Sequence, residues 1–474
     1  MMLLFLILFP LLLGTLALFL PSERLRCWLL PLAGTLHLGD VVVIACNPLT
    51  GNLWIGLDAL SLLVLLVTST LYFACSIYAV SYLQLRSDRG TRTIVACLLI
   101  FLSAMTLATA ARHLGLLWMA VEATTIASAP LIYYNRNRLS IEATWKYLLI
   151  CSVGIALALL GMLFLAYAAL LGGVEVTLQF DHLLAESSAL STAWLRAGFV
   201  FLLVGFGTKM GLAPLHSWKP DAYGEAPGMI GALLAGGLTS ISFLAILRAV
   251  QVMNAAGLGD LARQQLLVLG VLSLLVAAIF MVRQNDVKRM LAYSSVEHMG
   301  ILAIGIGIGG LATFGALLHL VNNALTKGCM FLSVGNIHRA FASKKITDIH
   351  GAMRRLPISG TIFLAGFFAV TGSPPFGPFI SEFTILRGIF ADNHYWLAGA
   401  FLLLLAIVFI GMGSTVLGMV QGTPDATTDP AFQDTFLLVA PPLLLLLLVL
   451  LLGLYLPPPL RRLLEDAVVL LEVQ

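Results

Sequence analysis

The chain has 474 residues, of which 60% are hydrophobic and 10% carry a charge. Soluble domains contain about 25% Asp, Glu, Lys and Arg, so this composition excludes a water-soluble globular protein and indicates an integral membrane protein. The net charge is +3, from 26 basic and 23 acidic residues, which gives no support for a nucleic-acid partner.

Hydropathy predicts fourteen membrane spans joined by short polar connections, and therefore an all-α polytopic membrane protein. The first span has neither a basic start nor a small-residue cleavage site, so we expect a retained helix rather than a signal peptide. The second span is the weakest, because glycine and polar residues interrupt it. The predicted spans are 1–20, 28–46, 57–84, 93–111, 113–134, 142–171, 195–218, 228–250, 264–283, 289–309, 313–340, 357–390, 395–421 and 434–456.

Lys and Arg gather in the odd-numbered connections, whereas the connection between spans 13 and 14 has neither. The positive-inside rule places basic connections in the cytoplasm, so we expect both termini on the outer face of the cell inner membrane. The even-numbered connections hold only Arg112, Arg196, Arg248 and Arg263. The basic residues of the odd-numbered connections are Arg24, Arg26, Arg86, Arg89, Arg92, Arg136, Arg138, Lys219, Arg283, Lys288, Arg289, Arg339, Lys344, Lys345, Arg354 and Arg355.

Two spans are interrupted by Gly and Pro, and each has an ionisable residue at the interruption, Lys209 within 205–216 and Glu382 within 371–382. Paired broken helices in corresponding halves mark the transport site of many transporters, and their freed backbone groups must face protein or a hydrated cavity. A proline kink without function is the alternative. The domains predicted from this pairing are 1–92 with helices 1–3, 93–250 and 251–421 as two inverted five-helix repeats, and 422–474 with helix 14.

Several spans contain ionisable residues, although such a group at mid-membrane costs at least about 2.5 kcal/mol. Glu142 and Lys146 are four residues apart near a span end, which favours a structural ion pair. His319 and Lys327 are two helical turns apart and share one helix face, although a core histidine is the alternative for His319.

Glu297 and His298 are adjacent and point to different faces, so we expect at most one of them on a shared path.

These groups suit proton transfer. An ammonium in a dry environment is unfavourable and a nearby carboxylate stabilises it, so Glu122 with Lys209 fits a proton-loading pair. His319 and Lys327 would receive the proton at the centre and Glu382 would pass it outward, with water bridging the gaps.

The six cysteines stand singly, without the spacing of a metal or iron–sulfur site. We therefore expect no cofactor, no metal site and no catalytic residue in this chain. The cysteines are Cys27, Cys46, Cys75, Cys97, Cys151 and Cys329.

Five stretches resemble the antiporter-like subunits shared by respiratory complex I, Mrp-type cation/proton antiporters and energy-converting membrane-bound hydrogenases. Within that family, VEATT, SIEATWKYLLICSVGIALALLG (140–161) and SSVEHMG are most similar to the component F type of hydrogenase 4. The stretches are LLWMAVEATT (116–125), GTKMGLAPLHSWKPDAYGEAP (207–227), QNDVKRMLAYSSVEHMG (284–300), HLVNNALTKGCMFLSVGNI (319–337) and GSPPFGPFISEF (372–383).

The resemblance implies a fourteen-helix fold with two inverted repeats and proton translocation along a polar axis at mid-membrane. Glu122 matches the helix 5 glutamate of the family, Lys209 the helix 7 lysine, His319 and Lys327 the helix 11 residues, and Glu382 the helix 12 position. The accessory positions considered on the same path are Glu142, Lys146, His216, Ser240, Glu297, His298 and Asn323.

Two positions depart from the family pattern: Ser240 replaces a helix 8 lysine or histidine, and Asn323 replaces a second helix 11 histidine. Neither side chain titrates, so the central link is expected to rest on His319, Lys327 and water. Because the sequence continues only to Gln474, soon after span 14, we also do not expect the long lateral helix that some relatives append.

Three functions remain open. The first is a proton-translocating subunit of a redox-driven complex, driven by other membrane-arm subunits and a peripheral redox module, because the chain has no nucleotide loop or soluble head. The second is a subunit exchanging Na⁺ or another cation for protons, and the third is a membrane anchor that conducts nothing. A stand-alone enzyme is disfavoured.

Overall fold

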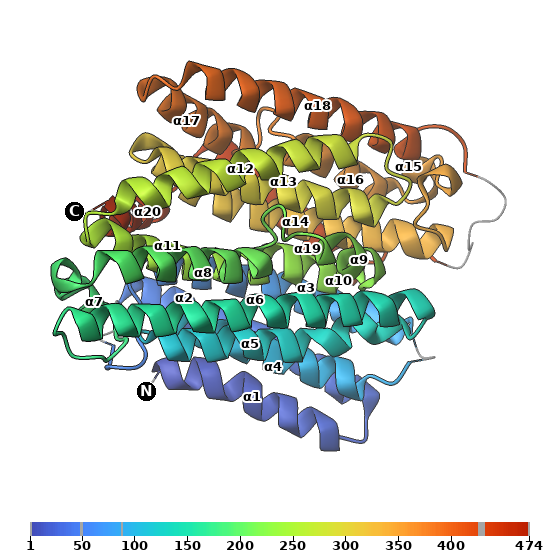
Figure 1. Cartoon of the computed structure of the whole chain (residues 1–474). Helices are drawn as coiled ribbons and strands as arrows, with labels where there is room; N and C mark the ends of the chain where they lie inside the picture. Colours follow the sequence, from blue (N-terminus) through green and yellow to red (C-terminus); the bar gives the residue numbers. More distant parts are fainter. Residues whose placement is uncertain (1, 48–50, 87–88, 425–431, 473–474) are drawn as a thin grey trace.

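The computed structural model describes residues 2–47, 51–86, 89–424 and 432–472. Over these residues the chain is helical, with isolated β-bridges in place of strands. Figure 1 shows long helices side by side in a bundle, with the two chain ends at the same end of the helices. Twelve of the described helices are long and apolar enough to cross a membrane, which confirms the multi-span fold.

The N-terminal part contains six long helices whose starts follow from capping residues. Asp58 accepts the Ser61 amide at the start of α3, and Asn137 forms a capping box with Ser140 at the start of α6. Helix α2 begins five residues before the predicted span because Ser22 caps it. The helices are α1 (Met2–Phe19), α2 (Glu23–Cys46), α3 (Ala59–Gln84), α4 (Arg92–Ala110), α5 (Leu114–Ile132) and α6 (Arg138–Leu171).

The middle of the chain forms the centre of the bundle. The continuous helix over Gly228–Ala255 is the most buried of the candidate spans, and it includes a π-helical segment, η3. The elements are η1 (Tyr133–Asn135), α7 (Phe180–Ala185), η2 (Ser187–Ala189), α8 (Thr192–Met210), α9 (Trp218–Glu225), α10 (Gly228–Ala232), η3 (Leu233–Leu238), α11 (Thr239–Ala255), α12 (Gly259–Met281) and α13 (Val287–Ile308).

Two predicted spans of the C-terminal part, 313–340 and 357–390, have no counterpart among the twelve candidate membrane-crossing helices of the described chain. Helix α14 carries many polar residues, and the predicted span 357–390 divides into α16 and α17, so the count of fourteen spans stays a prediction. The elements are α14 (Leu311–Phe341), η4 (Ile346–Asp348), α15 (Ala352–Arg355), α16 (Pro357–Val370), α17 (Gly377–Ala391), α18 (Tyr395–Val420), α19 (Phe436–Leu454) and α20 (Pro458–Glu472).

Both predicted helix interruptions are present. One lies between α8 and α9 and includes Gly211 at φ 78° and a cis Ala213–Pro214 bond. The other lies between α16 and α17 and includes Gly372 at φ 64° and a cis Pro374–Pro375 bond. The positive φ at both glycines is a conformation that only glycine adopts readily.

Helix α20 is absent from the predicted spans, which end at residue 456. It is amphipathic, and buries Leu464, Ala467 and Leu471 at helical spacing. Gln251 Nε2 and Asn254 Nδ2, near the end of α11, donate to the carbonyls of the last turn of α20 at 2.9 and 2.6 Å. A search for long apolar runs overlooks such a helix because only one of its faces is apolar.

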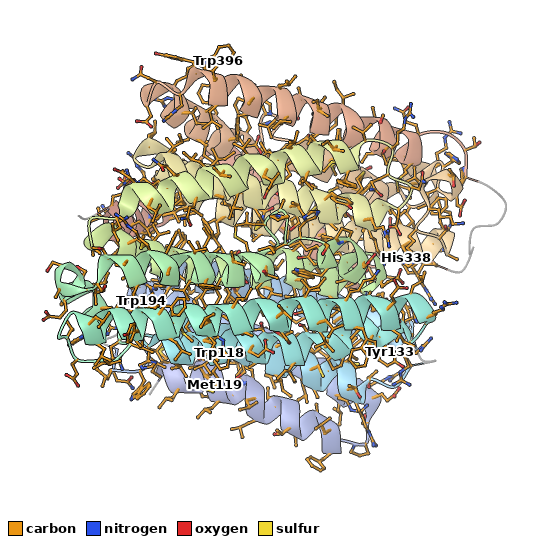
Figure 2. All side chains as sticks on the ribbon, viewed as in Figure 1. Trp118, Met119, Tyr133, Trp194, His338 and Trp396 are labelled. Carbon is orange, nitrogen blue, oxygen red and sulfur yellow. The ribbon has the colours of Figure 1, made fainter. Side chains whose placement is uncertain are left out.

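Aromatic side chains mark the two ends of the bundle. Figure 2 shows Trp194 and Trp396 toward one end of the helices and Tyr133 toward the other, and Trp396 is 95% exposed. Trp and Tyr concentrate at both membrane–water interfaces. This distribution suits helices that run from one interface to the other.

Candidate functional site

Lys209 lies in the last turn of α8, immediately before the helix break, and is fully buried. Its Nζ donates to Thr125 Oγ1 at 2.6 Å and to the Tyr147 hydroxyl at 2.9 Å. Thr125 Oγ1 in turn donates to Glu122 Oε2 at 2.9 Å. The predicted pair of Glu122 and Lys209 is therefore bridged by a hydroxyl group of α5, where water had been expected.

A similar set of residues lies between α13 and α14 in the second half. Lys327 is fully buried, and its Nζ donates to Ser294 Oγ at 2.5 Å. Ser294 Oγ donates to Glu297 Oε2 at 3.3 Å. In both halves a lysine therefore donates to a hydroxyl group, which in turn donates to a glutamate. The sequence analysis did not anticipate this repeated arrangement.

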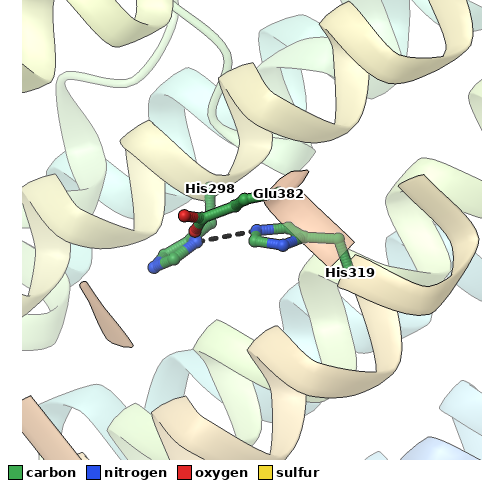
Figure 3. Close-up of side chains that lie close together, drawn as sticks. All are labelled: His298, His319 and Glu382. Carbon is green, nitrogen blue, oxygen red and sulfur yellow. Dashed lines mark hydrogen bonds between the residues drawn. The ribbon is translucent and has the colours of Figure 1, made fainter. Parts of the chain in front are cut away.

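A histidine pair extends the second set. His298 Nδ1 and His319 Nε2 share a hydrogen bond of 2.8 Å, and His319 Nδ1 bonds Ser381 Oγ of α17 at 2.9 Å. Figure 3 shows the two rings facing each other with the carboxylate of Glu382 beside them. One ligand atom from each of the three residues lies within 4.8 Å of the others, so the group can share a proton or bind a cation.

The expectation that at most one of Glu297 and His298 would face the path is wrong. Glu297 is linked through Ser294 to Lys327, and His298 bonds His319. His298 bonds α14 directly, whereas Glu297 is connected to it through Ser294 of its own helix. Their partners on α14, His319 and Lys327, are two helical turns apart.

The accessory residues lie mostly outside this chain of contacts. Glu142 and Lys146 form the predicted ion pair at 2.6 Å, with both side chains about half exposed, and Lys146 also pairs with Asp221 of α9 at 2.9 Å. Ser240 donates to the Gly236 carbonyl of its own helical segment at 2.5 Å. These contacts stabilise helices and their packing.

The other two accessory residues lie near the helix breaks. His216 is half-buried in the first break, with its ring 6.2 Å from that of Tyr293. Asn323 is buried, and its Oδ1 has no hydrogen-bond partner among the described residues. Neither residue connects the lysines to each other.

Lys219 corrects the sequence analysis, which placed it among the basic residues of a cytoplasmic connection. It lies in α9 with its side chain fully buried, and Nζ donates to Ser295 Oγ of α13 at 3.1 Å. Hydropathy suggested a loop because Lys219 precedes Pro220 directly after the Gly/Pro break. The sequence did contain one signal that Lys219 belongs to the site: it lies in the same family-like stretch, 207–227, as Lys209.

Lys209, Lys219 and Lys327, each 0% exposed, have one property in common. None of them forms an ion pair with a carboxylate in the part of the chain that the structure describes, and each donates to a hydroxyl group instead. A buried ammonium without a paired carboxylate is costly. Such lysines are suited to alternate between the ammonium and the neutral amine.

Residues 111–409 match the family described as NADH:quinone oxidoreductase/Mrp antiporter, TM. The chain therefore belongs to this family of membrane subunits, as the motifs predict.

Among curated relatives, the chain is 32% identical over 426 residues to the hydrogenase-4 component F homolog of Methylacidiphilum infernorum, covering 86% of this chain and 88% of the relative. It is 29% identical over 371 residues to hydrogenase-4 component B of Escherichia coli, covering 75% of this chain and 54% of the relative. The predicted similarity to the component F type is confirmed.

Solved structures agree on the fold. A chain of the Mrp complex from Dietzia sp. superposes with a TM-score of 0.88 at 19% identity, covering 99% of this chain and 97% of that chain. A chain of respiratory complex I from Thermus thermophilus with bound NADH gives a TM-score of 0.83 at 25% identity, covering 99% and 100%. Both neighbours are chains of larger complexes.

Proposed function

We propose that this chain translocates protons across the cell inner membrane as a membrane subunit of a redox-driven complex. The observation that carries the proposal is the pair of lysine–hydroxyl–glutamate sets, Lys209–Thr125–Glu122 and Lys327–Ser294–Glu297, with both lysines fully buried. Ionisable groups inside a membrane bundle are costly and usually serve transport. Two such sets in one chain are difficult to explain by packing alone.

The first set suits proton uptake. Glu122 is half-buried and also accepts a hydrogen bond from Ser152, an exposed residue of α6, at 3.1 Å. A proton on Glu122 passes through the Thr125 hydroxyl, which can accept from one neighbour while it donates to the other. Lys209 is the buried group that holds it.

The second set and the histidine pair suit transfer toward the far side. His298 and His319 relay a proton between their rings by exchanging donor and acceptor roles. Glu382 stands next in the direction of the surface, because it lines a surface cavity of about 440 Å³, which is mostly apolar and has Thr371 and Ser373 as its other polar side chains. Protonation of this carboxylate and release into the cavity would complete the path.

We further propose that the complex contains a peripheral redox module and that this chain holds no cofactor of its own. All six cysteines are free and none is paired with another. The driving energy would then reach the chain through its membrane neighbours. The crowding of basic residues in the odd-numbered connections supports a cytoplasmic position for these connections and an outer position for both termini.

Cation/proton exchange is the second candidate function. The ligand atoms of His298, His319 and Glu382, within 4.8 Å of one another, favour it, and the likeness to a subunit of the Mrp complex is consistent with it. Transport by inverted membrane vesicles that requires Na⁺ would support exchange and contradict a pure proton pump.

The test of the proposal is Lys209→Ala in the intact complex, isolated through a tag on this chain and reconstituted in proteoliposomes. We expect proton uptake per redox turnover to fall to the background leak while assembly persists. Lys288→Met is the matched control, because Lys288 is also buried but donates to the backbone carbonyl of Ala226 at 3.1 Å. Unchanged proton uptake in the assembled Lys209→Ala complex would support the non-conducting anchor. Mass spectrometry of the same preparation identifies the redox module.

A further inference from the structure

Lys219 is a buried lysine that the proposed path does not yet use. It is 0% exposed in α9, and its hydrogen bond to Ser295 Oγ is made to a neutral group. Burial of an ammonium without a carboxylate partner is unfavourable, whereas the neutral amine can be buried far more easily. A structural role does not require a lysine here, because a methionine has a similar length and no charge.

The two helix breaks give Lys219 a counterpart in the second half. A Cβ atom on Gly211, at positive φ, would lie 2.3 Å from Lys219 Cε. A Cβ atom on Gly372, also at positive φ, would lie 2.0 Å from Glu382 Oε2. In each break, the space over the glycine is filled by a charged side chain that follows the break. Lys219, rather than Lys209, therefore corresponds in position to Glu382.

Aromatic contacts place Lys219 beside the first lysine set. Lys209 Nζ lies 4.8 Å from the centre of the Tyr147 ring, and Lys219 Nζ lies 5.9 Å from that of Tyr223. Trp218 packs against both rings, with centroid distances of 5.0 Å to Tyr147 and 5.9 Å to Tyr223. Trp218 Nε1 also donates to the carbonyl of Thr208, the residue before Lys209, at 2.8 Å. The indole ring of Trp218 thus packs against both the tyrosine that Lys209 contacts and the tyrosine that Lys219 contacts.

Lys219 and the second lysine set bond to neighbouring serines of α13. Ser295 accepts from Lys219, and Ser294 accepts from Lys327 at 2.5 Å. Lys219 interacts electrostatically with Lys327 of α14, Cys151 of α6, His298 of α13 and His216 of the first break. Ammonium groups on Lys219 and Lys327 repel each other, so the charged state of one favours the neutral state of the other.

We propose that Lys219 is the proton-binding site that joins the two halves of the chain, in place of the basic residue that α11 lacks at Ser240. In the transfer step, Lys219 changes from ammonium to amine and Lys327 from amine to ammonium. One proton moves from the Ser295 hydroxyl to the Ser294 hydroxyl through bridging water, no bond between heavy atoms breaks and no electron is transferred. The inference rests on the proposed proton translocation and adds a residue to it.

The experiment compares Lys219→Met and Lys219→Arg with the parent in the tagged, reconstituted complex, by measuring proton uptake per redox turnover. Methionine removes the titrating group, and arginine keeps the charge but does not release a proton. Both should lower proton uptake by about 10²-fold, the scale for loss of a positioned proton-transfer group. Full proton uptake with either variant overturns the inference.

Two comparisons separate this inference from the proposed function and from a folding defect. If Lys209→Ala abolishes proton uptake but Lys219→Met does not, only the inference about Lys219 fails. If neither change affects proton uptake, the proposed function fails as well.

Ser295→Ala removes the acceptor and leaves Lys219 in place. An assembled Ser295→Ala complex should therefore also lose proton uptake, and normal uptake would contradict a role for Ser295 in the transfer. Lys288→Met again serves as the control that keeps uptake.

Discussion

The two lysine–hydroxyl–glutamate sets share their chemistry but differ in exposure. Glu122 is half-buried and has a second hydroxyl partner in Ser152, whereas Glu297 is 2% exposed and accepts from Ser294 alone among the described residues. The hydroxyl–carboxylate bond is 2.9 Å in the first set and 3.3 Å in the second. The first set can therefore collect protons at the edge of the bundle, where Glu122 lies, and the second can hold them at the centre, where Glu297 lies.

Neutralising the two glutamates gives the largest effect and tests this contrast directly. Glu297→Gln should lower proton uptake per redox turnover by about 10²-fold, because removal of a positioned proton-transfer group has effects of that order. Glu122→Gln should lower it less, since Ser152 and the partly exposed edge still give access to Thr125. The measurement is dye-detected proton uptake in proteoliposomes. Equal losses in the two variants would show that exposure does not distinguish the sets.

Removing the bridging hydroxyls should have an intermediate effect. Thr125→Val keeps the shape of the side chain and Ser294→Ala nearly so, but each separates a lysine from its glutamate. We expect a loss of about tenfold in proton uptake for each, smaller than the glutamate effect because water can partly replace a hydroxyl. Thr125→Ser is the matched control and should retain uptake. If Thr125→Val behaves like Thr125→Ser, the hydroxyl is not part of the path.

An ion pair away from the path should affect stability and leave proton uptake unchanged. Arg248 binds both carboxylate oxygens of Asp58 at 2.6 and 2.9 Å, and its side chain is 10% exposed. Asp58→Asn leaves a buried guanidinium without its carboxylate, which typically costs about 3–5 kcal/mol. The midpoint of thermal unfolding in detergent should fall, while proton uptake per assembled complex stays at the parent value. A loss of uptake without a lower midpoint would extend the path toward α3.

Much of the site could be predicted from the sequence because charge and glycine are rare inside a membrane span. Lys209 and Glu382 stand out beside their Gly/Pro breaks for this reason, and His319 with Lys327 by their helical spacing. Lys219 was missed because hydropathy cannot distinguish a short buried helix after a break from a loop. The domain boundaries and the inverted repeats stay predictions.

The hydroxyl bridges could not be foreseen either. Thr125 and Ser294 are ordinary residues of apolar helices, and only the approach of the Lys209 side chain to α5 and of the Lys327 side chain to α13 places them between a lysine and a glutamate. Helix α20 was overlooked for a related reason: its buried residues at three- and four-residue spacing form one apolar face, which a search for continuous apolar runs does not detect.

Helix α20 also limits how the two halves can move. It receives hydrogen bonds from Gln251 and Asn254 of α11, and its Glu472 carboxylate accepts the amide of Gly310 at the start of α14. One short helix therefore connects α11 to the beginning of α14, at the end of the bundle where both termini lie (Figure 1). Any rotation of the two halves against each other that keeps these hydrogen bonds has its pivot at this end of the bundle.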